Sequence, residues 1–404
     1  MNHMNSKTVI GLGVAAAVAL IAAAAINSSR KPHSEGAQTA SYALPELADH
    51  LNDVKSLGLT GPGSQPIATL EKGGQGWTLK EKGGYRADAG KVREYLLKLS
   101  QARLIEQKTA NEQRYADLGV SDISAAEAKG VLVTLDGLGK PAQLIVGTVS
   151  PRGDGTFVRR AGDKQSWLAK GNIAPDKNPT YWLDASITDI PATRVREFSL
   201  HKPDAKPLRG FKTQAADTNY QVADLPKGRE LSSEFAANTL GTTLAGLNFE
   251  DVFPAAQNPP PADKVFRATY STFDGVVVEV TAWKKDETKF YAQFRADKDA
   301  AAAEAAVTQA QAKAKADYEA QQAAQPADAK DAKDAKPAAP PAAVSDPAKD
   351  KADRFAAVDS EVAALKQRFE GWTFALPQHK FANLDKSVDE LLKPLEQKPA
   401  ATKK

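Results

Sequence analysis

The sequence contains no cysteine, and this absence excludes disulfide bonds, thiolate nucleophiles and a lipid-modified cysteine anchor. It also lacks an excess of either charge, since 53 basic and 50 acidic residues leave a net charge of +3. A nucleic-acid-binding protein is expected to carry a clustered basic face, so we predict no nucleic-acid partner. A chain of 404 residues is long enough to fold through apolar burial without disulfides.

Recognisable catalytic motifs are missing as well. The sequence has neither the phosphate-binding pattern G-x-x-x-x-G-K-[ST] nor the nucleophile pattern G-x-S-x-G. Its five histidines include no pair at i, i+4 spacing, so we predict no metal site and no cofactor. Two carboxylate pairs, Asp184 with Asp189 and Glu250 with Asp251, are the only acid–base candidates that we considered, and their spacing does not place them across a cleft. We therefore predict that the protein is not an enzyme.

One long apolar run, residues 8–26, is the most prominent positive feature of the sequence. It contains no charged residue and is close to the roughly 20 residues that a helix needs to cross a bilayer. We expect residues 1–7 to form a short cytoplasmic start, 8–26 a transmembrane anchor in contact with lipid, and 27–43 a flexible tether. A signal peptide cleaved near Ala22–Ala25 and an alanine-rich core helix stay open as alternatives.

The rest of the sequence predicts an α+β fold with two similar domains, each an antiparallel meander with packed helices. In the first domain, residues 44–200, strands surround a helix that begins at Asp88 and repeats apolar residues at helical spacing. The second domain, residues 201–296, repeats the order of strands, helix and meander, with its helix expected at 231–247. Residues 352–394 are expected to complete this second domain.

Two segments are predicted to lie outside these domains. Residues 297–351 are rich in alanine, lysine, aspartate and proline. Their first half favours helix on propensity, whereas the prolines and Asp-Ala-Lys triplets that follow favour disorder. Residues 395–404 are expected to form a polar tail.

Motifs spread along the body resemble an uncharacterised bacterial family, the domain of unknown function 4340. The motifs that carry the resemblance include Tyr85-Arg-Ala-Asp88, Tyr115-Ala-Asp-Leu-Gly-Val120, Leu144-Ile-Val-Gly147, Trp182-Leu-Asp184 and Gly371-Trp-Thr-Phe-Ala-Leu-Pro377. We expect the matching residues to be structural. They are Trp77, Asp88, Tyr115, Leu118, Gly119, Val120, Gly147, Trp167, Trp182, Asp184 and Trp372.

The resemblance implies a single-pass protein of the bacterial inner membrane with its body in the periplasm. Such proteins are often associated with ABC-type export systems of the gliding-motility kind, and the family supplies no catalytic residue. We therefore expect a non-enzymatic accessory or scaffold protein whose partners include ABC-type transporter subunits. The alternative is a periplasmic ligand- or glycan-binding module that uses the cleft between the two domains.

A small basic patch is the remaining candidate for binding. Arg152, Arg159 and Arg160 lie in and just before a predicted strand, and together they could face anionic lipid or glycan. The alternative, which we favour, is a solvated strand edge that charged side chains protect from pairing with another chain.

Overall fold

The structure, a computed structural model, describes residues 41–324 and 344–394. These residues form helices and antiparallel sheets, which confirms the predicted mixture of helix and strand. The expectations for the anchor at 8–26, for disorder within 325–343 and for the tail at 395–404 lie outside the described residues. Within the described ranges, no helix is both long enough and apolar enough to cross a membrane.

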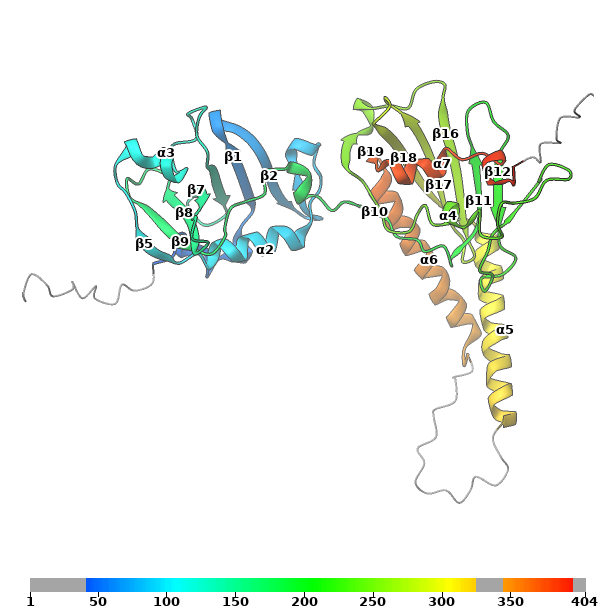
Figure 1. Ribbon diagram of the computed structural model, residues 1–404. Coiled ribbons are helices and arrows are strands. Elements are labelled where there is room, and N and C mark those ends of the chain that lie inside the picture. Colours follow the sequence, from blue (N-terminus) through cyan, green and yellow to red (C-terminus); the bar gives the residue numbers. More distant parts are fainter. Residues whose placement is uncertain (1–40, 325–343, 395–404) are drawn as a thin grey trace, which may run out of the picture. The chain divides into compact units, whose positions relative to one another are not determined.

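The chain divides into two compact units, each assembled from separate stretches of sequence (Figure 1). Unit 1 comprises the residues up to Lys72 and then Gly90–Lys177, whereas unit 2 comprises Gly73–Ala89 and the residues from Asn178 onward. The chain therefore enters unit 2, returns to unit 1 and enters unit 2 again. This division differs from the predicted boundary at residue 200, because residues 178–200 and the segment 73–89 both belong to unit 2.

Unit 1 is built on antiparallel strands in the order β2-β1-β6-β7-β8-β9-β5. Its strands are β1 (Ser56–Gly61), β2 (Gln65–Gly73), β5 (Leu104–Gln107), β6 (Val131–Asp136), β7 (Ala142–Val149), β8 (Gly155–Arg160) and β9 (Ser166–Lys170). Its helices are α2 (Ala89–Ser100) and α3 (Tyr115–Leu118). The predicted meander of strands is thus present in this unit.

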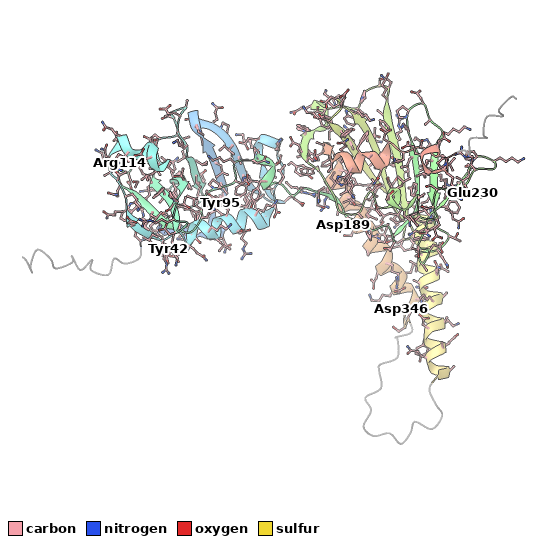
Figure 2. All side chains as sticks on the ribbon, viewed as in Figure 1. Tyr42, Tyr95, Arg114, Asp189, Glu230 and Asp346 are labelled. Atoms are coloured by element: carbon pink, nitrogen blue, oxygen red, sulfur yellow. The ribbon has the colours of Figure 1, made fainter. Side chains whose placement is uncertain are left out.

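Helix α2 buries the apolar face that its spacing predicts. Val92, Tyr95 and Leu99 recur at helical intervals, and all three are buried. Figure 2 labels Tyr95 on the ribbon of this unit. Its hydroxyl donates a hydrogen bond of 3.3 Å to Ile173 O, which satisfies the polar end of this buried ring. The helix begins directly after Asp88, the residue predicted to precede its first turn.

The segment from Tyr115 to Val120 closes a small core over the sheet of unit 1. Helix α3 ends at Gly119, whose φ of +69° is a left-handed conformation that favours glycine. Tyr115 and Val120 are buried in one apolar cluster with Ile145. Gly147 of β7 allows the backbone to approach, because a Cβ there would overlap the Leu118 carbonyl oxygen and lie 2.9 Å from Val120 Cγ1.

This close approach predicts a cost for adding one methyl group. Gly147→Ala is expected to lower the free energy of unfolding by about 1–3 kcal/mol, because the segment at 118–120 must move to admit the Cβ. The measurement is chemical denaturation followed by circular dichroism. Gly58→Ala in β1 is the matched control, since its Cβ would have no neighbour closer than 3.7 Å. Equal stability of the two variants would contradict a tight contact at Gly147.

Unit 2 is built on a second antiparallel sheet, in the order β13-β12-β11-β16-β17-β18-β19-β15. Its strands are β11 (Val195–His201), β12 (Leu208–Phe211), β13 (Gln221–Val222), β15 (Asp251–Pro254), β16 (Val265–Thr272), β17 (Val276–Lys284), β18 (Phe290–Lys298) and β19 (Trp372–Leu376). Shorter strands are β3 (Gly76–Leu79), β4 (Tyr85–Arg86), β10 (Ser186–Thr188) and β14 (Leu247–Asn248). The helices are α4 (Asn238–Gly241), α5 (Ala300–Ala324), α6 (Pro347–Phe369) and α7 (Gln378–Leu384).

One face of this sheet carries the apolar core of unit 2. Phe294 of β18 lies 5.4 Å from Phe369 of α6, measured between ring centroids. Phe290 of the same strand stacks on Phe381 of α7 at 4.7 Å. Because residues 290 and 294 share one face of a strand, α6 and α7 cover the same side of the sheet. Neither helix covers the opposite face of the sheet.

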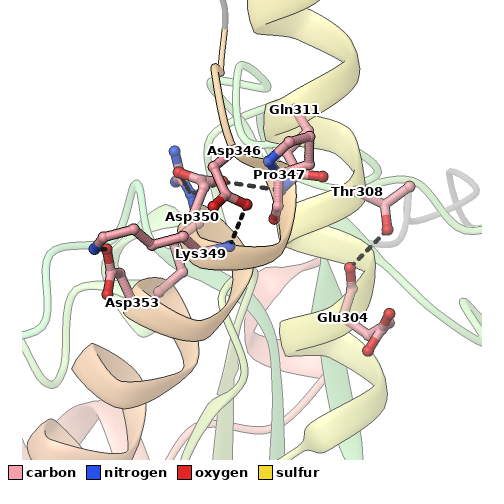
Figure 3. Close-up of polar contacts among 9 residues, drawn as sticks. Glu304, Thr308, Gln311, Asp346, Pro347, Lys349, Asp350 and Asp353 are labelled. Atoms are coloured by element: carbon pink, nitrogen blue, oxygen red, sulfur yellow. Dashed lines mark hydrogen bonds and ion pairs between the residues drawn. The ribbon is translucent and has the colours of Figure 1, made fainter.

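Helices α5 and α6 pack side by side and extend beyond the sheet (Figures 1 and 3). The Asp346 side chain caps α6 by accepting a hydrogen bond of 3.0 Å from Lys349 N. Gln311 of α5 donates to Pro347 O at 2.8 Å and so ties the two helices together. The helix expected in the first half of 297–351 is therefore present, whereas residues 347–351 are helical and not disordered.

Residues 73–89 are fastened to unit 2 by an ion pair and by ring contacts. Lys82 Nζ lies 2.6 Å from Asp251 Oδ1. Tyr85 is only 2% exposed and makes edge-on contacts with Phe249 and Trp372, at centroid distances of 5.3 and 4.9 Å. This short segment thus contributes a buried aromatic side chain to the core of unit 2.

The helix predicted at 231–247 is wrong for most of its length. Only α4, a single turn at 238–241, is α-helical there. Gly246 has a φ of +52°, which an α-helix does not accept. Thr242 and Thr243, which follow α4 directly, are β-branched, which further weakens helix propensity. The second unit therefore does not repeat the helix of the first.

Candidate functional site

A groove of 890 Å³ lies along β16, β17 and β18 of the unit 2 sheet and reaches Lys366 and Phe369 in the last turn of α6. Along β16, β17 and β18, alternate side chains such as Phe266, Val280 and Phe294 point into the core, and those between them point outward. The outward residues that line the groove are Arg267, Thr269, Glu279, Thr281, Gln293 and Arg295.

The walls of the groove come from two connecting segments. Ala255 and Pro260 lie on the segment after β15, and Glu370 and Trp372 lie at the turn between α6 and β19. Strand β19 pairs with β18 only opposite residues 290–292, so the two strands diverge beyond that point. The groove extends into the space where they separate.

Strand register arranges the polar side chains in two rows. Thr281 of β17 lies opposite Arg267 on one side and opposite Gln293 on the other. In the next row, Glu279 lies between Thr269 and Arg295. Neighbouring strands are about 4.8 Å apart, so each row spans roughly 10 Å across three strands. This length suits an extended ligand or a segment of a partner protein.

A buried threonine fixes the amide at one end of the first row. Gln293 Nε2 donates to Thr373 Oγ1 at 2.9 Å, and that hydroxyl in turn donates to Asn258 O at 2.9 Å. Thr373 is fully buried, with 0% of its surface exposed. The Gln293 side chain is therefore held in one orientation before any ligand arrives.

Three charged side chains of the groove have no ion-pair partner among the described residues. Arg267, Glu279 and Arg295 are exposed and form no ion pair with another residue in the described ranges. Lys366, by contrast, lies 3.7 Å from Asp297 Oδ1. The free guanidinium groups can donate paired hydrogen bonds to a carboxylate, and Glu279 can accept hydrogen bonds from a donor.

The groove has the chemistry of a binding surface with charges of both signs. Its side chains offer hydrogen-bond donors, acceptors and, at Trp372, an aromatic ring. In the part of the chain that the structure describes, no group of three or more His, Cys, Asp or Glu side chains is placed to hold a metal ion.

The predicted family residues fall into two groups, one in each unit. In unit 2, Asp88 N donates to Trp182 O at 2.8 Å, and Ala87 N donates to Trp77 O at 2.7 Å. Asp184 lies 3.1 Å from Arg86, and Trp372 contacts Tyr85. The residues in unit 1 are those of the small core already described, Tyr115, Leu118, Gly119, Val120 and Gly147, together with Trp167 on β9.

The predicted basic patch needs a correction, because Arg159 is buried and only 3% exposed. Its guanidinium donates to Val120 O, Asp163 O and Asp122 Oδ1, and it lies 4.5 Å from the centroid of the Tyr115 ring. It is neither a surface ligand-binding residue nor a solvated edge residue.

The other two arginines of that patch differ from Arg159 and from each other. Arg160 donates to Ala43 O and Tyr42 O at 2.9 and 2.7 Å, so it holds the start of the described chain. Arg152 is exposed in the loop before β8. The three arginines therefore do not form one exposed patch.

Most of the carboxylates considered as acid–base candidates have structural partners. Asp184 pairs with Arg86, and Asp189 Oδ1 accepts a hydrogen bond of 2.7 Å from Gly246 N. Asp251 pairs with Lys82. The groove residues, in contrast, were not selected from the sequence. Their alternation with apolar residues was visible there, but it did not reveal which sheet face stays uncovered.

Comparison with known proteins identifies one family. The model of a domain of unknown function, DUF4340, matches residues 77–268. The match begins inside the β3–β4 segment and ends within β16, so it includes parts of both units. No curated protein and no solved structure matches the chain.

Proposed function

Residues 77–268 belong to the family of the domain of unknown function 4340, and on this premise we propose that the protein is a non-enzymatic, membrane-anchored accessory subunit. In this proposal, residues 8–26 anchor the chain in the bacterial inner membrane and the body, built as two α+β domains, lies in the periplasm. The body binds a membrane or periplasmic protein, and ABC-type transporter subunits are the partners that the family resemblance suggests.

The groove on the unit 2 sheet is the observation that carries this proposal. It presents Arg267, Arg295 and Glu279 without ion-pair partners among the described residues, beside the partly exposed Trp372. Interfaces between separately folded proteins are about as polar as the rest of the surface, and they are enriched in arginine and tryptophan. A docking role explains why these side chains face an open groove.

A second candidate function, a periplasmic ligand- or glycan-binding module, is favoured by the size of the same groove. Its volume of 890 Å³ lies within the range of small-molecule sites, about 300–1,000 Å³. The two arginines could bind the carboxylates of an acidic glycan, and Trp372 could pack against a sugar ring. In this candidate function the ligand binds within unit 2, whereas the sequence suggested the cleft between the domains.

Site-specific photo-crosslinking in native membranes tests the docking proposal. A photo-reactive amino acid in place of Thr281, at the centre of the first row, is expected to capture a transporter subunit or another membrane protein. The captured partner is identified by mass spectrometry. The matched control carries the same amino acid in place of Lys285, which is exposed in the turn after β17 and does not line the groove.

The outcomes separate the two candidates. Protein capture from position 281 alone would support the accessory function. Capture of wall glycan alone from that position would favour the binding module. Equal capture from both positions, or none from position 281, would contradict a binding role for the groove.

A further inference from the structure

Two arginines from distant parts of unit 2 bind neighbouring carbonyl groups of the short strand β10. Arg86 of β4 donates from Nη2 to Ser186 O at 2.8 Å. Arg368 of α6 donates from Nη1 to Ile187 O at 3.4 Å. The two guanidinium groups are close enough for each charge to act on the other. Like charges held this close in a partly buried place call for a compensating negative charge.

A single nearby carboxylate, that of Asp184, supplies only part of this compensation. Its Oδ2 atom lies 3.1 Å from Arg86 Nε, and its charge also acts on Arg368. Two guanidinium groups against one carboxylate leave the cluster with an excess of positive charge. The Arg86 and Asp184 side chains are 30% and 38% exposed, so the cluster is open to solvent on one side.

The same cluster contains buried donors without acceptors. The Tyr85 hydroxyl and Arg368 Nε are shielded from solvent and form no hydrogen bond with any described residue, whereas Arg86 Nε faces Asp184 Oδ2 at 3.1 Å. Buried polar atoms are nearly always paired with protein, water or an ion, so two such donors in one cluster require an explanation. Each of them can donate a hydrogen bond, and neither group is an anion.

Electrostatics agrees with this geometry. Burial, and then the positive charge of Arg86, lower the pKa of the Arg368 guanidinium. Burial raises the pKa of Tyr85 to about 12, so its hydroxyl keeps its proton and remains a donor at neutral pH. A negative ion at this point would relieve the repulsion between the two arginines.

We propose that Tyr85, Arg86 and Arg368 form an oxyanion site, beside the Asp184 carboxylate that pairs with Arg86, and that it binds a phosphate ion or a carboxylate of similar size. A guanidinium group presents parallel N–H donors that match two oxygens of such an ion. A cation is disfavoured by two neighbouring arginines, and a water molecule could accept hydrogen bonds without balancing the charge. The site is separate from the groove, so it does not depend on the docking proposal.

A bound oxyanion would also connect two segments of unit 2. Arg86 belongs to the segment 73–89, and Arg368 belongs to the last turn of α6. The ion would therefore hold this segment against the helix, in addition to the Lys82–Asp251 pair and the Tyr85 ring contacts. Binding is expected to stabilise unit 2 rather than to support a reaction.

Equilibrium dialysis of the full-length protein against radiolabelled inorganic phosphate, at constant ionic strength, tests the site. We expect saturable binding, together with a rise in the temperature of thermal unfolding that chloride does not produce. Acetate, a small carboxylate, is the second probe and shows which oxyanion geometry the site prefers. Saturable binding of acetate alone would assign the site to carboxylates.

The variants locate the site. Arg368→Gln is expected to weaken binding at least about tenfold, because it removes a charged donor pair. Arg368→Lys keeps the charge but loses the paired donors, so it should weaken binding less. Arg354→Gln, in an exposed arginine of the same helix that pairs with Asp350, should bind like the wild type.

No saturable binding of either probe, or equal loss in R354Q and R368Q, would overturn the proposal. R368K provides the test if R368Q does not fold.

Discussion

Phe374→Ala is expected to lower the free energy of unfolding of unit 2 by about 3–5 kcal/mol, the range typical of removing a buried aromatic ring. Phe374 lies on β19, and its side chain is 0% exposed. Its ring centroid lies 5.7 Å from that of Phe249, 5.8 Å from that of Phe294 and 6.0 Å from that of Tyr85. Alanine at this position would therefore leave a cavity that three separate elements border.

Tryptophan fluorescence during chemical denaturation measures this loss. Trp77, Trp182, Trp283 and Trp372 belong to unit 2, whereas Trp167 belongs to unit 1, so the signal reports mainly on unit 2. Phe235→Ala makes the same chemical change at a side chain that is 61% exposed, and it should alter stability by less than about 0.5 kcal/mol. Similar midpoints for F374A and F235A would show that the aromatic cluster does not stabilise unit 2.

Arg159→Met is expected to destabilise unit 1 by about 2–4 kcal/mol, because it leaves buried acceptors without their donor. Val120 O and Asp163 O each lose a hydrogen bond, of 2.9 and 3.0 Å, and the Tyr115 ring loses the guanidinium packed over it. Asp122 contributes less to the loss, because its side chain is 73% exposed and becomes hydrated when the arginine is removed.

Hydrogen exchange measured by mass spectrometry can localise this effect to residues 115–122. Exchange there should become faster in R159M, since the segment loses the hydrogen bonds that hold it on β8. Arg152→Met is the matched control, because Arg152 is exposed in the preceding loop. If the two arginines acted together as a surface patch, both variants would keep wild-type exchange and lose binding to the same anionic surface. That outcome would contradict the structural role of Arg159.

Much of the strand pattern could be predicted because it follows from local alternation. Glycine turns and alternating apolar residues predict antiparallel meanders, and β6, β7, β16 and β17 belong to such meanders. At 231–247, leucines recur at helical spacing, but Gly246 takes a positive φ and Leu247 begins the strand β14. Neither the turn nor the strand follows from the spacing of the leucines.

Neither the groove nor the oxyanion site could be read from the sequence. Thr269, Glu279 and Arg295 form one row only because β16, β17 and β18 pair in a particular register. Arg86 and Arg368 are 282 positions apart in the numbering and lie near each other because both bind carbonyl groups of β10. The burial of Arg159 was equally hidden, since arginine in a short strand usually marks an exposed position.

The interleaving of the two units constrains how the protein is made and how it can be divided. A ribosome releases the last residue of unit 1, Lys177, well before it synthesises Phe249, Trp372 and Phe374, which pack around Tyr85. The nascent chain therefore carries the Tyr85 ring without these aromatic partners until unit 2 is almost complete. For the same reason, a fragment cut at residue 177 retains Tyr85 but lacks the three rings that pack around it. An expression fragment for unit 1 would need a short polar linker in place of residues 73–89.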